Sequence, residues 1–356
     1  MSKPINAFKH IEMPELLSLG QGMLKYLPEI VDKVALRGKG LLITDAFLKD
    51  KYAKEVEAIM EAEKREIVVS VIEDSTLAEV DKQLQLFKEI DAGYAIGLGG
   101  GRPIDVAKLT SFKANKRFIS IPTIASHDGL ASSRASLKGV DKQHSVEARP
   151  PIAVVGDTDI LDSAPYRFTV AGCGDVIAKK TAVKDWLLAH RLKNELISPT
   201  SISLSEMTVK LITENASLIR SQAEGFSRVV MNCLIASSLA MCTAGSSRPG
   251  SGSEHMFSHA LDSIAKTPAL HGEQTAFGTI MMAYLHDGIE GSNDVKDIMK
   301  ILGLPTTAKE LGVSAEEVIK ALETAHTIRK RFTILGSEGL SHEAATNVAL
   351  RTGVIN

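Results

Sequence analysis

Three histidines fall within seventeen positions of the stretch HMFSHALDSIAKTPALHGE, residues 255–273. His255 and His259 are four residues apart, so on a helix they share a face, as the two metal ligands of the HExxH motif do. His271 comes just before GEQTAFG, where a further helix is expected to begin. Because imidazole is a common zinc ligand, the cluster predicts a metal site. Spacing alone leaves the role of His271 open, and any of the three can also be an ordinary surface histidine.

An aspartate earlier in the chain could supply an oxygen ligand. Asp175 lies in VAGCGDVIAKK (170–180), a run of small, helix-forming residues. An aspartate in such a run is more often a helix cap or a solvated charge. Zinc accepts mixed histidine and carboxylate ligands, however, and a catalytic site needs only three protein ligands and an open position. Asp175 is therefore a candidate partner for the histidines.

A glycine-rich turn, GLGGGRPIDVAK (97–108), follows an apolar run and precedes an expected helix. Glycines let the backbone approach a pyrophosphate, and the following helix N-terminus offers unpaired N–H groups. Arg102 stands where the third glycine of GxGxxG would fall, so a turn that only connects strand to helix stays an alternative. Asp105 can equally be a helix-dipole residue. The candidate cofactor residues of this turn are Gly99, Gly100, Gly101, Arg102, Pro103 and Asp105.

Further candidate cofactor contacts follow other expected strands. Asp45 ends LLITD, a position where a carboxylate can bind the adenosine ribose and disfavour a 2′-phosphate, which tilts the prediction slightly from NADP towards NAD. Thr123, Ser126 and Ser132 lie in ISIPTIASHDGLASSRASL (119–137), where they could contact ribose, phosphate and nicotinamide. An acidic residue at the end of a strand is also common where no ligand binds, and the run 119–137 could be a plain surface turn.

The elements that would position these residues alternate in the first half of the chain. A helical pattern of apolar residues occupies 75–92, between two of the strand-like runs. This alternation predicts βα units on a mainly parallel sheet, which bind ligands at the carboxyl ends of their strands. The expected strands are 40–45, 67–72, 93–100, 117–122 and 152–157.

Helical periodicity takes over from about residue 160. One helical run covers 205–222, and another, 314–330, opens with a Ser–x–x–Glu capping box. The sequence therefore predicts an NAD(P)-binding α/β domain over 1–160 and a helical metal- and substrate-binding domain over 161–356, with the active site between them.

Composition narrows the functional classes. The chain has 356 residues, 44% hydrophobic and 24% charged, with a net charge of −2, which argues against disorder and against a broad nucleic-acid surface. No signal-like run opens the sequence and no twenty-residue apolar run follows, so we expect a cytoplasmic protein without membrane insertion. Cys173, Cys233 and Cys242 lack metal spacing, which argues against a closed structural zinc site and favours buried thiols.

Several motifs in order carry a resemblance from about residue 15 to the C-terminus. GGGRPIDVAK, PTIASHDG, AGCGD, SGSEHMFSHALD and HGEQTAFG together resemble the sn-glycerol-1-phosphate dehydrogenase family. That family is part of a superfamily with glycerol dehydrogenases, iron-dependent alcohol dehydrogenases and dehydroquinate synthases. The resemblance implies a dehydroquinate synthase-like fold: a Rossmann-like nucleotide-binding α/β domain, then an all-α domain, with the metal between them.

The resemblance also implies which residues hold the metal. It assigns Asp175, His255 and His271 as the ligands of one Zn²⁺ per subunit and turns His259 towards the substrate, against the pairing that helical spacing favours. Lys179 replaces the further histidine that iron-dependent alcohol dehydrogenases typically carry one turn after the aspartate. Three protein ligands favour zinc over iron.

The implied activity is reversible reduction of dihydroxyacetone phosphate by NAD(P)H to sn-glycerol 1-phosphate, a glycerophospholipid backbone, in a homo-oligomer. Asp128 and His259 are the expected catalytic residues and contact the substrate hydroxyls beside Asp175. Arg248 is the first candidate for the substrate phosphate, with Lys179 and Lys180 as alternatives. A polyol dehydrogenase acting on unphosphorylated glycerol is the nearest rival, ahead of a lyase or a nucleotide-binding module with a structural metal.

Overall fold

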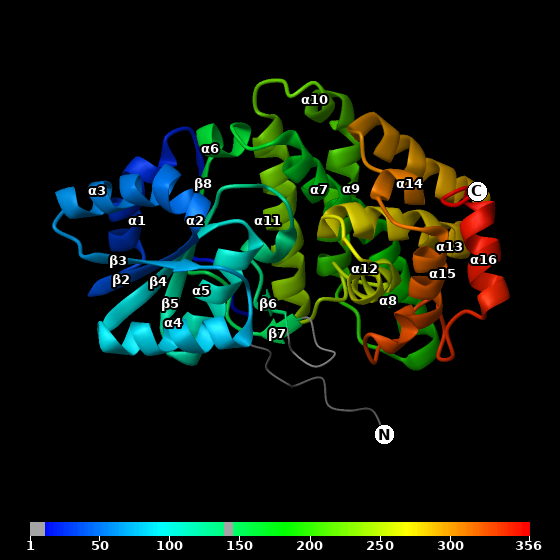
Figure 1. Cartoon of the computed structure of the whole chain (residues 1–356), viewed down its shortest axis with the longest axis horizontal. Helices are drawn as coiled ribbons and strands as arrows, with labels where there is room; N and C mark the ends of the chain where they lie inside the picture. The colour runs from blue at the N-terminus through cyan, green and yellow to red at the C-terminus, as the bar shows by residue number, and fades with distance from the viewer. Residues whose placement is uncertain (1–10, 139–144) are drawn as a thin grey trace.

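A computed structural model of the chain describes residues 11–138 and 145–356. The sheet fills the left of Figure 1 and helices fill the right, so the predicted α/β half followed by a helical half is confirmed. The strands of the main sheet are β1 (Leu16–Gly20), β2 (Lys39–Asp45), β3 (Ile67–Ile72), β4 (Ala92–Gly99), β5 (Arg117–Pro122) and β8 (Ala153–Asp157).

The main sheet is parallel throughout, in the order β1-β8-β5-β4-β2-β3. Leu41 and Ile43 of β2 pack into one apolar cluster, and Leu42 packs into the other. This alternation is expected of a strand whose two faces are both covered by helices. The covering segments of this half are η1 (Met23–Tyr26), α1 (Leu27–Lys33), α2 (Ala46–Leu48), η2 (Lys49–Ala53), α3 (Lys54–Ala62), α4 (Leu77–Glu89), α5 (Gly101–Lys113) and η3 (Asp128–Leu130).

Five strands lie where the sequence predicts them, and three were missed. β1 is an edge strand that pairs with β8 alone, far along the chain. Its five residues are mostly half-exposed, so they show no clear alternation of apolar and polar side chains. β6 (Arg134–Ser136) and β7 (Ser145–Glu147) form a small antiparallel pair of three residues each. Strands this short depend on their partners more than on their own sequence.

Helices make up the second half. The run predicted over 205–222 is divided between two helices at Asn215, and the capping box of Ser314 and Glu317 is confirmed. All six sheet strands end by Asp157, and the domain boundary at residue 160 stays a prediction. The helices are α6 (Thr158–Asp162), α7 (Tyr166–Ile177), α8 (Lys179–Lys193), α9 (Pro199–Glu214), α10 (Ala216–Arg220), α11 (Phe226–Ala244), α12 (Ser253–Ile264), α13 (His271–Leu302), α14 (Ala308–Leu311), α15 (Ala315–Thr324), η4 (Ala325–Thr327) and α16 (His342–Arg351).

One helix in the described part of the chain, α11, is long and apolar enough to span a membrane. Its apolar window is 67% buried inside the protein, and it packs against α7, α9 and η3. Figure 1 shows it running between the sheet and the other helices. Such surroundings are those of a core helix, whose apolar residues are covered by protein.

Helices α7 and α13 cross with their backbones in contact. A Cβ on Gly272 would lie 1.8 Å from the carbonyl oxygen of Ala171, and a Cβ on Gly174 would lie 2.2 Å from that of Gly272. Only glycine fits at either position. Asp175 follows Gly174 on α7 and His271 precedes Gly272 on α13, so the crossing brings these two side chains together.

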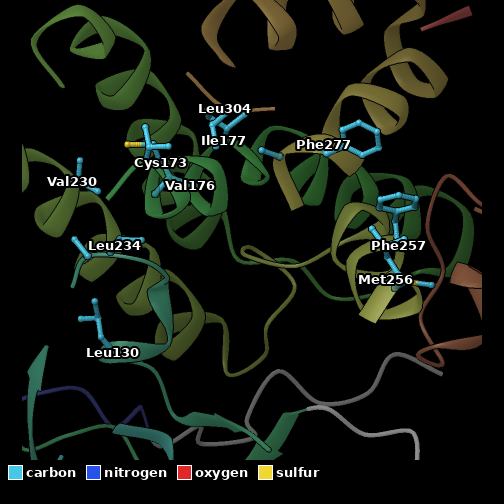
Figure 2. Close-up of a cluster of buried hydrophobic side chains, with 14 of the residues drawn as sticks. Leu130, Cys173, Val176, Ile177, Val230, Leu234, Met256, Phe257, Phe277 and Leu304 are labelled. Atoms are coloured by element: carbon cyan, nitrogen blue, oxygen red, sulfur yellow. The ribbon is translucent and has the colours of Figure 1, made fainter. Parts of the chain in front are cut away.

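The core fixes the helices beside those polar residues. Figure 2 shows Cys173 and Val176 of α7 facing Val230 and Leu234 of α11. Met256 and Phe257 follow His255 on α12, and the ring of Phe257 lies 6.0 Å from that of Phe277 on α13. Because packed interiors resist displacement, the polar side chains on these helices are held in fixed relative positions.

The crossing of α7 and α13 can be tested by adding one methyl group. Gly272→Ala should lower the free energy of unfolding by about 1–3 kcal/mol, because the added carbon forces the two backbones apart. Urea denaturation measures the change. Gly20→Ala is the matched control, because its Cβ would meet nothing closer than Met23 at 3.8 Å. Equal stability of the two variants would contradict close contact at the crossing.

Candidate metal and substrate site

Three side chains from three helices converge next to this crossing. Asp175 of α7, His255 of α12 and His271 of α13 each offer one ligand atom, and these atoms lie within 4.8 Å of one another. His255 Nε2 is 3.3 Å from Asp175 Oδ1, and the rings of His255 and His271 are 5.1 Å apart. His259 stacks on His271 at 5.7 Å but is outside the group. The convergence selects the set that the resemblance implies.

The hydrogen bonds of His255 test whether a cation fits there. Its Nδ1 lies 2.8 Å from Glu254 Oε1 and its Nε2 lies 3.3 Å from Asp175 Oδ1. Burial lowers the pKa of His255, but the bonds to Asp175 and Glu254 outweigh burial and raise that pKa, so without a metal both ring nitrogens carry protons. A bound metal ion would take the place of the proton between His255 Nε2 and Asp175 Oδ1, while Glu254 would keep the proton on Nδ1. One oxygen and two nitrogen ligands suit zinc. The residues present therefore fit a zinc ion.

The electrostatics keep the three groups ready to bind a metal. Burial raises the pKa of Asp175, but the Lys179 ammonium and the bond from His255 outweigh it and hold that pKa well below its usual value. Burial lowers the pKa of His271 to about 4, and the charge of His255 adds to the effect. At neutral pH Asp175 is therefore ionised and His271 neutral, the forms that coordinate metals.

Lys179 joins the metal group to the loop that carries Asp128. Its Nζ donates to Asp175 Oδ1 at 2.9 Å, to the Asp175 carbonyl at 2.7 Å, and to Asp128 Oδ2 at 2.8 Å. Burial lowers its pKa, but the two carboxylates outweigh burial and raise it to about 12. Lys180 pairs instead with Asp294 at 3.4 Å. Neither lysine matches its predicted alternative role at the substrate phosphate.

Asp128 is held beside the three candidate ligands. Its backbone N–H donates to Asp175 Oδ2 at 2.8 Å, and its Oδ2 accepts from Ser237 Oγ at 2.7 Å. Ser238 of α11 donates to its carbonyl oxygen. The loop at the end of β5 is thus docked on α7 and α11, which places the expected catalytic carboxylate next to the metal group.

His127 connects the same loop to the glycine-rich turn. Its Nδ1 accepts from Gly129 N at 2.9 Å, and its Nε2 would lie 2.6 Å from a Cβ on Gly101. Gly99 has φ +148°, and Leu48 and Pro103 pack against it. Neither Gly99 nor Gly101 therefore has room for a side chain, and the turn leaves bare backbone at the start of α5, where a pyrophosphate could approach.

Other predicted cofactor residues gather along the same edge of the sheet. Asp45 accepts from Leu48 N at 2.9 Å and caps α2, at the end of the strand next to β4. Thr123 N donates to the Gly99 carbonyl at 3.0 Å. Ser126 lies partly buried in the loop that follows β5. The carboxyl ends of β2, β4 and β5 thus bring these residues together.

Asp105 and Ser132 have internal partners instead. Asp105 accepts from Lys108 Nζ at 3.1 Å and from Ser136 N at 2.9 Å, so both of its oxygens are used. Ser132 Oγ lies 3.4 Å from the carbonyl oxygens of Gly129 and Arg134. Both residues shape the loop after β5, and their predicted direct contact with the cofactor gains no support.

Arg102 and Pro103, also in the glycine-rich turn, differ in exposure. Arg102 is exposed and donates to the Glu73 carbonyl at 3.3 Å, near the ends of β2 and β3. Pro103 is buried in the first turn of α5, where its missing N–H costs nothing. Arg102 can reach solvent and a ligand, whereas Pro103 acts through the shape of the turn.

Arg248 does not occupy the position that the sequence suggested. Its guanidinium forms a forked ion pair with both carboxylate oxygens of Glu195, and its Nη1 donates to the Phe332 carbonyl at 2.9 Å. It is buried, with its charge already paired. The sequence could not show this, because Glu195 lies in a distant segment. Two further arginines had no signal in the sequence: Arg329 Nη2 lies 3.4 Å from His259 Nε2, and Arg331 contacts Ser247 and Ser251.

Comparisons with known proteins agree with this geometry. Residues 18–165 match a family described as iron-containing alcohol dehydrogenase. A glycerol-1-phosphate dehydrogenase (NAD(P)+) from Methanosarcina acetivorans is 46% identical over 352 residues, 99% of this chain and 98% of that protein. The chain belongs to the glycerol-1-phosphate dehydrogenase family. A second relative of that name, from Pyrococcus horikoshii, is 46% identical over 97% of this chain and 99% of its own length.

Solved structures share the fold of the family at lower identity. The crystal structure of a probable glycerol dehydrogenase from Sinorhizobium meliloti 1021 has a TM-score of 0.80 at 18% identity and covers 97% of this chain and 98% of its own. Glycerol dehydrogenase from Schizosaccharomyces pombe has a TM-score of 0.79 at 21% identity, covering 97% and 90%. These likenesses show the two-part architecture and no more.

Glu254 is a buried carboxylate that the sequence analysis missed. It accepts from His255 Nδ1, from Gly252 N at 2.6 Å and from Thr181 Oγ1 at 2.8 Å. Glu254→Gln keeps the shape but removes the charge that makes His255 a stronger ligand, so zinc affinity should fall about 10- to 100-fold. Competition with a chelator measures it. The exposed Glu290→Gln is the control, and identical affinities in the two variants would exclude this role.

Proposed function

We propose that the protein is an NAD(P)H- and zinc-dependent dehydrogenase that reduces dihydroxyacetone phosphate reversibly to sn-glycerol 1-phosphate. The observation that carries the proposal is the buried group of Asp175, His255 and His271 beside Asp128, at the sheet edge that ends in a glycine-rich turn. The two relatives at 46% identity bear the name of this activity. The fold alone would not distinguish it from the reactions of distant structural neighbours.

The chain's own residues bind, orient and move a proton. When bound, zinc supplies a Lewis acid for the C2 oxygen, and NAD(P)H supplies the hydride to C2. Asp128, fixed by Lys179 and Ser237, accepts a hydrogen bond from a substrate hydroxyl. One proton from solvent completes the reduction at the C2 oxygen, and reversal returns it.

His259 is the residue placed to handle that proton. Burial lowers its pKa to about 3, against the opposing hydrogen bond to Asp262, so its ring is neutral at pH 7. A neutral imidazole can accept a hydrogen bond on one nitrogen and donate from the other. His259 therefore orients a substrate hydroxyl or relays a proton from solvent to the C2 oxygen.

The buried thiols and the exposed apolar side chains support the expected location and oligomeric state of the protein. Cys173, Cys233 and Cys242 are buried free thiols, which favours a cytoplasmic location. Exposed apolar side chains on α8 and α9, including Leu192 and Met207, favour a homo-oligomer, because such residues are commonly covered by a second subunit.

An absorbance assay tests the activity itself. The zinc-loaded protein should oxidise NADH with dihydroxyacetone phosphate at least ~10-fold more efficiently than with unphosphorylated dihydroxyacetone, because a phosphate contact contributes binding. Chiral analysis should identify the product as the sn-1 isomer. Preference for the unphosphorylated substrate would favour the polyol dehydrogenase alternative, and an sn-3 product would exclude the proposed reaction.

Zinc content separates the two possible histidine pairs. His271→Ala should lose zinc and activity but still bind NADH, because the glycine-rich turn lies on the sheet. His259→Asn should keep stoichiometric zinc and lose turnover about 10²- to 10⁴-fold, the usual contribution of a proton-transfer residue. Elemental analysis is done before kinetics. A metal-free His259→Asn beside a zinc-replete His271→Ala would reverse the assignment.

A further inference from the structure

Two loops meet beside the substrate-facing histidine. One is 245–252, which leads into α12, and the other is 328–335, which follows η4. Arg331 Nη2 donates to Ser247 Oγ at 3.0 Å and its Nη1 donates to the Ser251 carbonyl. Arg329 Nη1 lies 3.3 Å from Ser247 Oγ and 3.5 Å from Ser251 Oγ. The two loops thus hold a pair of guanidinium groups around two hydroxyls.

Neither guanidinium of this pair forms an ion pair with a carboxylate of the described residues. Within residues 11–138 and 145–356, no carboxylate oxygen lies within 4 Å of either guanidinium; the recorded partners are hydroxyls, a carbonyl and an imidazole. Burial, with the charge of Arg134, lowers the pKa of Arg329 to about 10. Burial, with the charges of Arg329 and Arg248, lowers the pKa of Arg331 to about 9, although the charges of Glu195 and Glu254 act in the opposite direction. Two partly desolvated cations side by side favour an anion between them.

The position of the pair relates it to the metal group. Arg329 Nη2 lies 3.4 Å from His259 Nε2, and His259 is one helical turn beyond His255 on α12. The anion site therefore adjoins the place where the reacting carbon must lie. In dihydroxyacetone phosphate only C3 and its ester oxygen separate C2 from phosphorus, so the phosphate must bind close to the metal.

Neighbouring residues make the two loops a fixed frame. Arg248, paired with Glu195, donates to the Phe332 carbonyl, directly beside Arg331 in the chain. The buried Asp185 of α8 accepts from Ile334 N at 2.7 Å and from Ser253 N at 2.7 Å. One carboxylate thereby ties the second loop to the start of α12. A frame this rigid holds the two guanidinium groups together despite their repulsion.

We propose that Arg329 and Arg331, with the hydroxyls of Ser247 and Ser251, bind the phosphate group of the substrate. The proposal rests on the proposed function and assigns its phosphate site to residues other than Arg248. A phosphate dianion neutralises both cations, and each guanidinium can donate two parallel N–H bonds to its oxygens. Arg248 acts as a positioning residue, because its ion pair with Glu195 fixes the loop that carries Arg331.

Substitution of the two arginines tests the site. Arg329→Ala and Arg331→Ala should each raise the KM for dihydroxyacetone phosphate about 10- to 100-fold, the loss expected for a charge-assisted bond. Zinc content and NADH affinity should stay at wild-type values. Lys330→Ala removes an exposed cation from the same loop and should change none of these quantities.

Inorganic phosphate provides a second readout that needs no turnover. It should bind the wild-type protein in a calorimetric titration and compete with dihydroxyacetone phosphate, and both effects should weaken at least ~10-fold in the alanine variants. Should these variants lose zinc or unfold, Arg329→Lys and Arg331→Lys keep a cation without the guanidinium fork and are scored by the same titration, with weakened phosphate binding expected.

The outcomes of these experiments test the phosphate site and the proposed dehydrogenase function separately. Folded, zinc-loaded arginine variants with wild-type KM and phosphate affinity would overturn the phosphate site, while wild-type turnover of dihydroxyacetone phosphate would leave the proposed function standing. Conversely, a wild-type protein that binds phosphate through these arginines but does not reduce dihydroxyacetone phosphate would support the anion site and refute the function.

Discussion

The buried carboxylate of Asp175 is the group on which the rest of the site depends. A carboxylate in a protein interior is stable only when its charge and lone pairs are satisfied. Here Oδ1 faces Lys179 and His255, and Oδ2 accepts the backbone N–H of Asp128. One side chain therefore links α7, α8 and α12 with the loop after β5. The glycine crossing then adds α13, because Asp175 adjoins Gly174 and His271 adjoins Gly272.

Two further buried carboxylates extend this arrangement outward. Glu254 fixes the ring of His255 and the backbone of Gly252, while Asp185 fixes Ser253 and the loop of Arg331 through Ile334. Both carboxylates are buried and accept backbone N–H groups, and Glu254 also bonds the His255 ring directly, so the geometry depends little on exposed side chains. Precise catalytic geometry generally requires supporting groups of this kind.

The sequence predicted those elements whose formation depends on residues close together in the chain. The central strands and the Ser314 capping box are legible because burial and capping act within a few residues. Helical spacing alone would have paired His255 with His259, because it describes one helix, whereas the third candidate ligand comes from α13 across the glycine crossing. The ion pair of Arg248 was hidden for the same reason, because its partner, Glu195, is near only after folding. The motif resemblance implied the three residues that the structure brings together, because motifs carry tertiary information that periodicity lacks.

The metal group and the arginine pair carry opposite net charges. Asp128, Asp175 and Glu254 carry three negative charges against the single ammonium of Lys179, an excess of two that a divalent cation would neutralise. Next to His259, Arg329 and Arg331 carry two positive charges with no carboxylate oxygen of the described residues within 4 Å, and a phosphate dianion would neutralise them. Because opposite charges in a low-dielectric site interact strongly, the metal and the phosphate stabilise each other's binding across the substrate. A substrate without the phosphate would leave the two guanidinium groups without an anion, so the proposed phosphate site would select a phosphorylated ketone by disfavouring the unphosphorylated one.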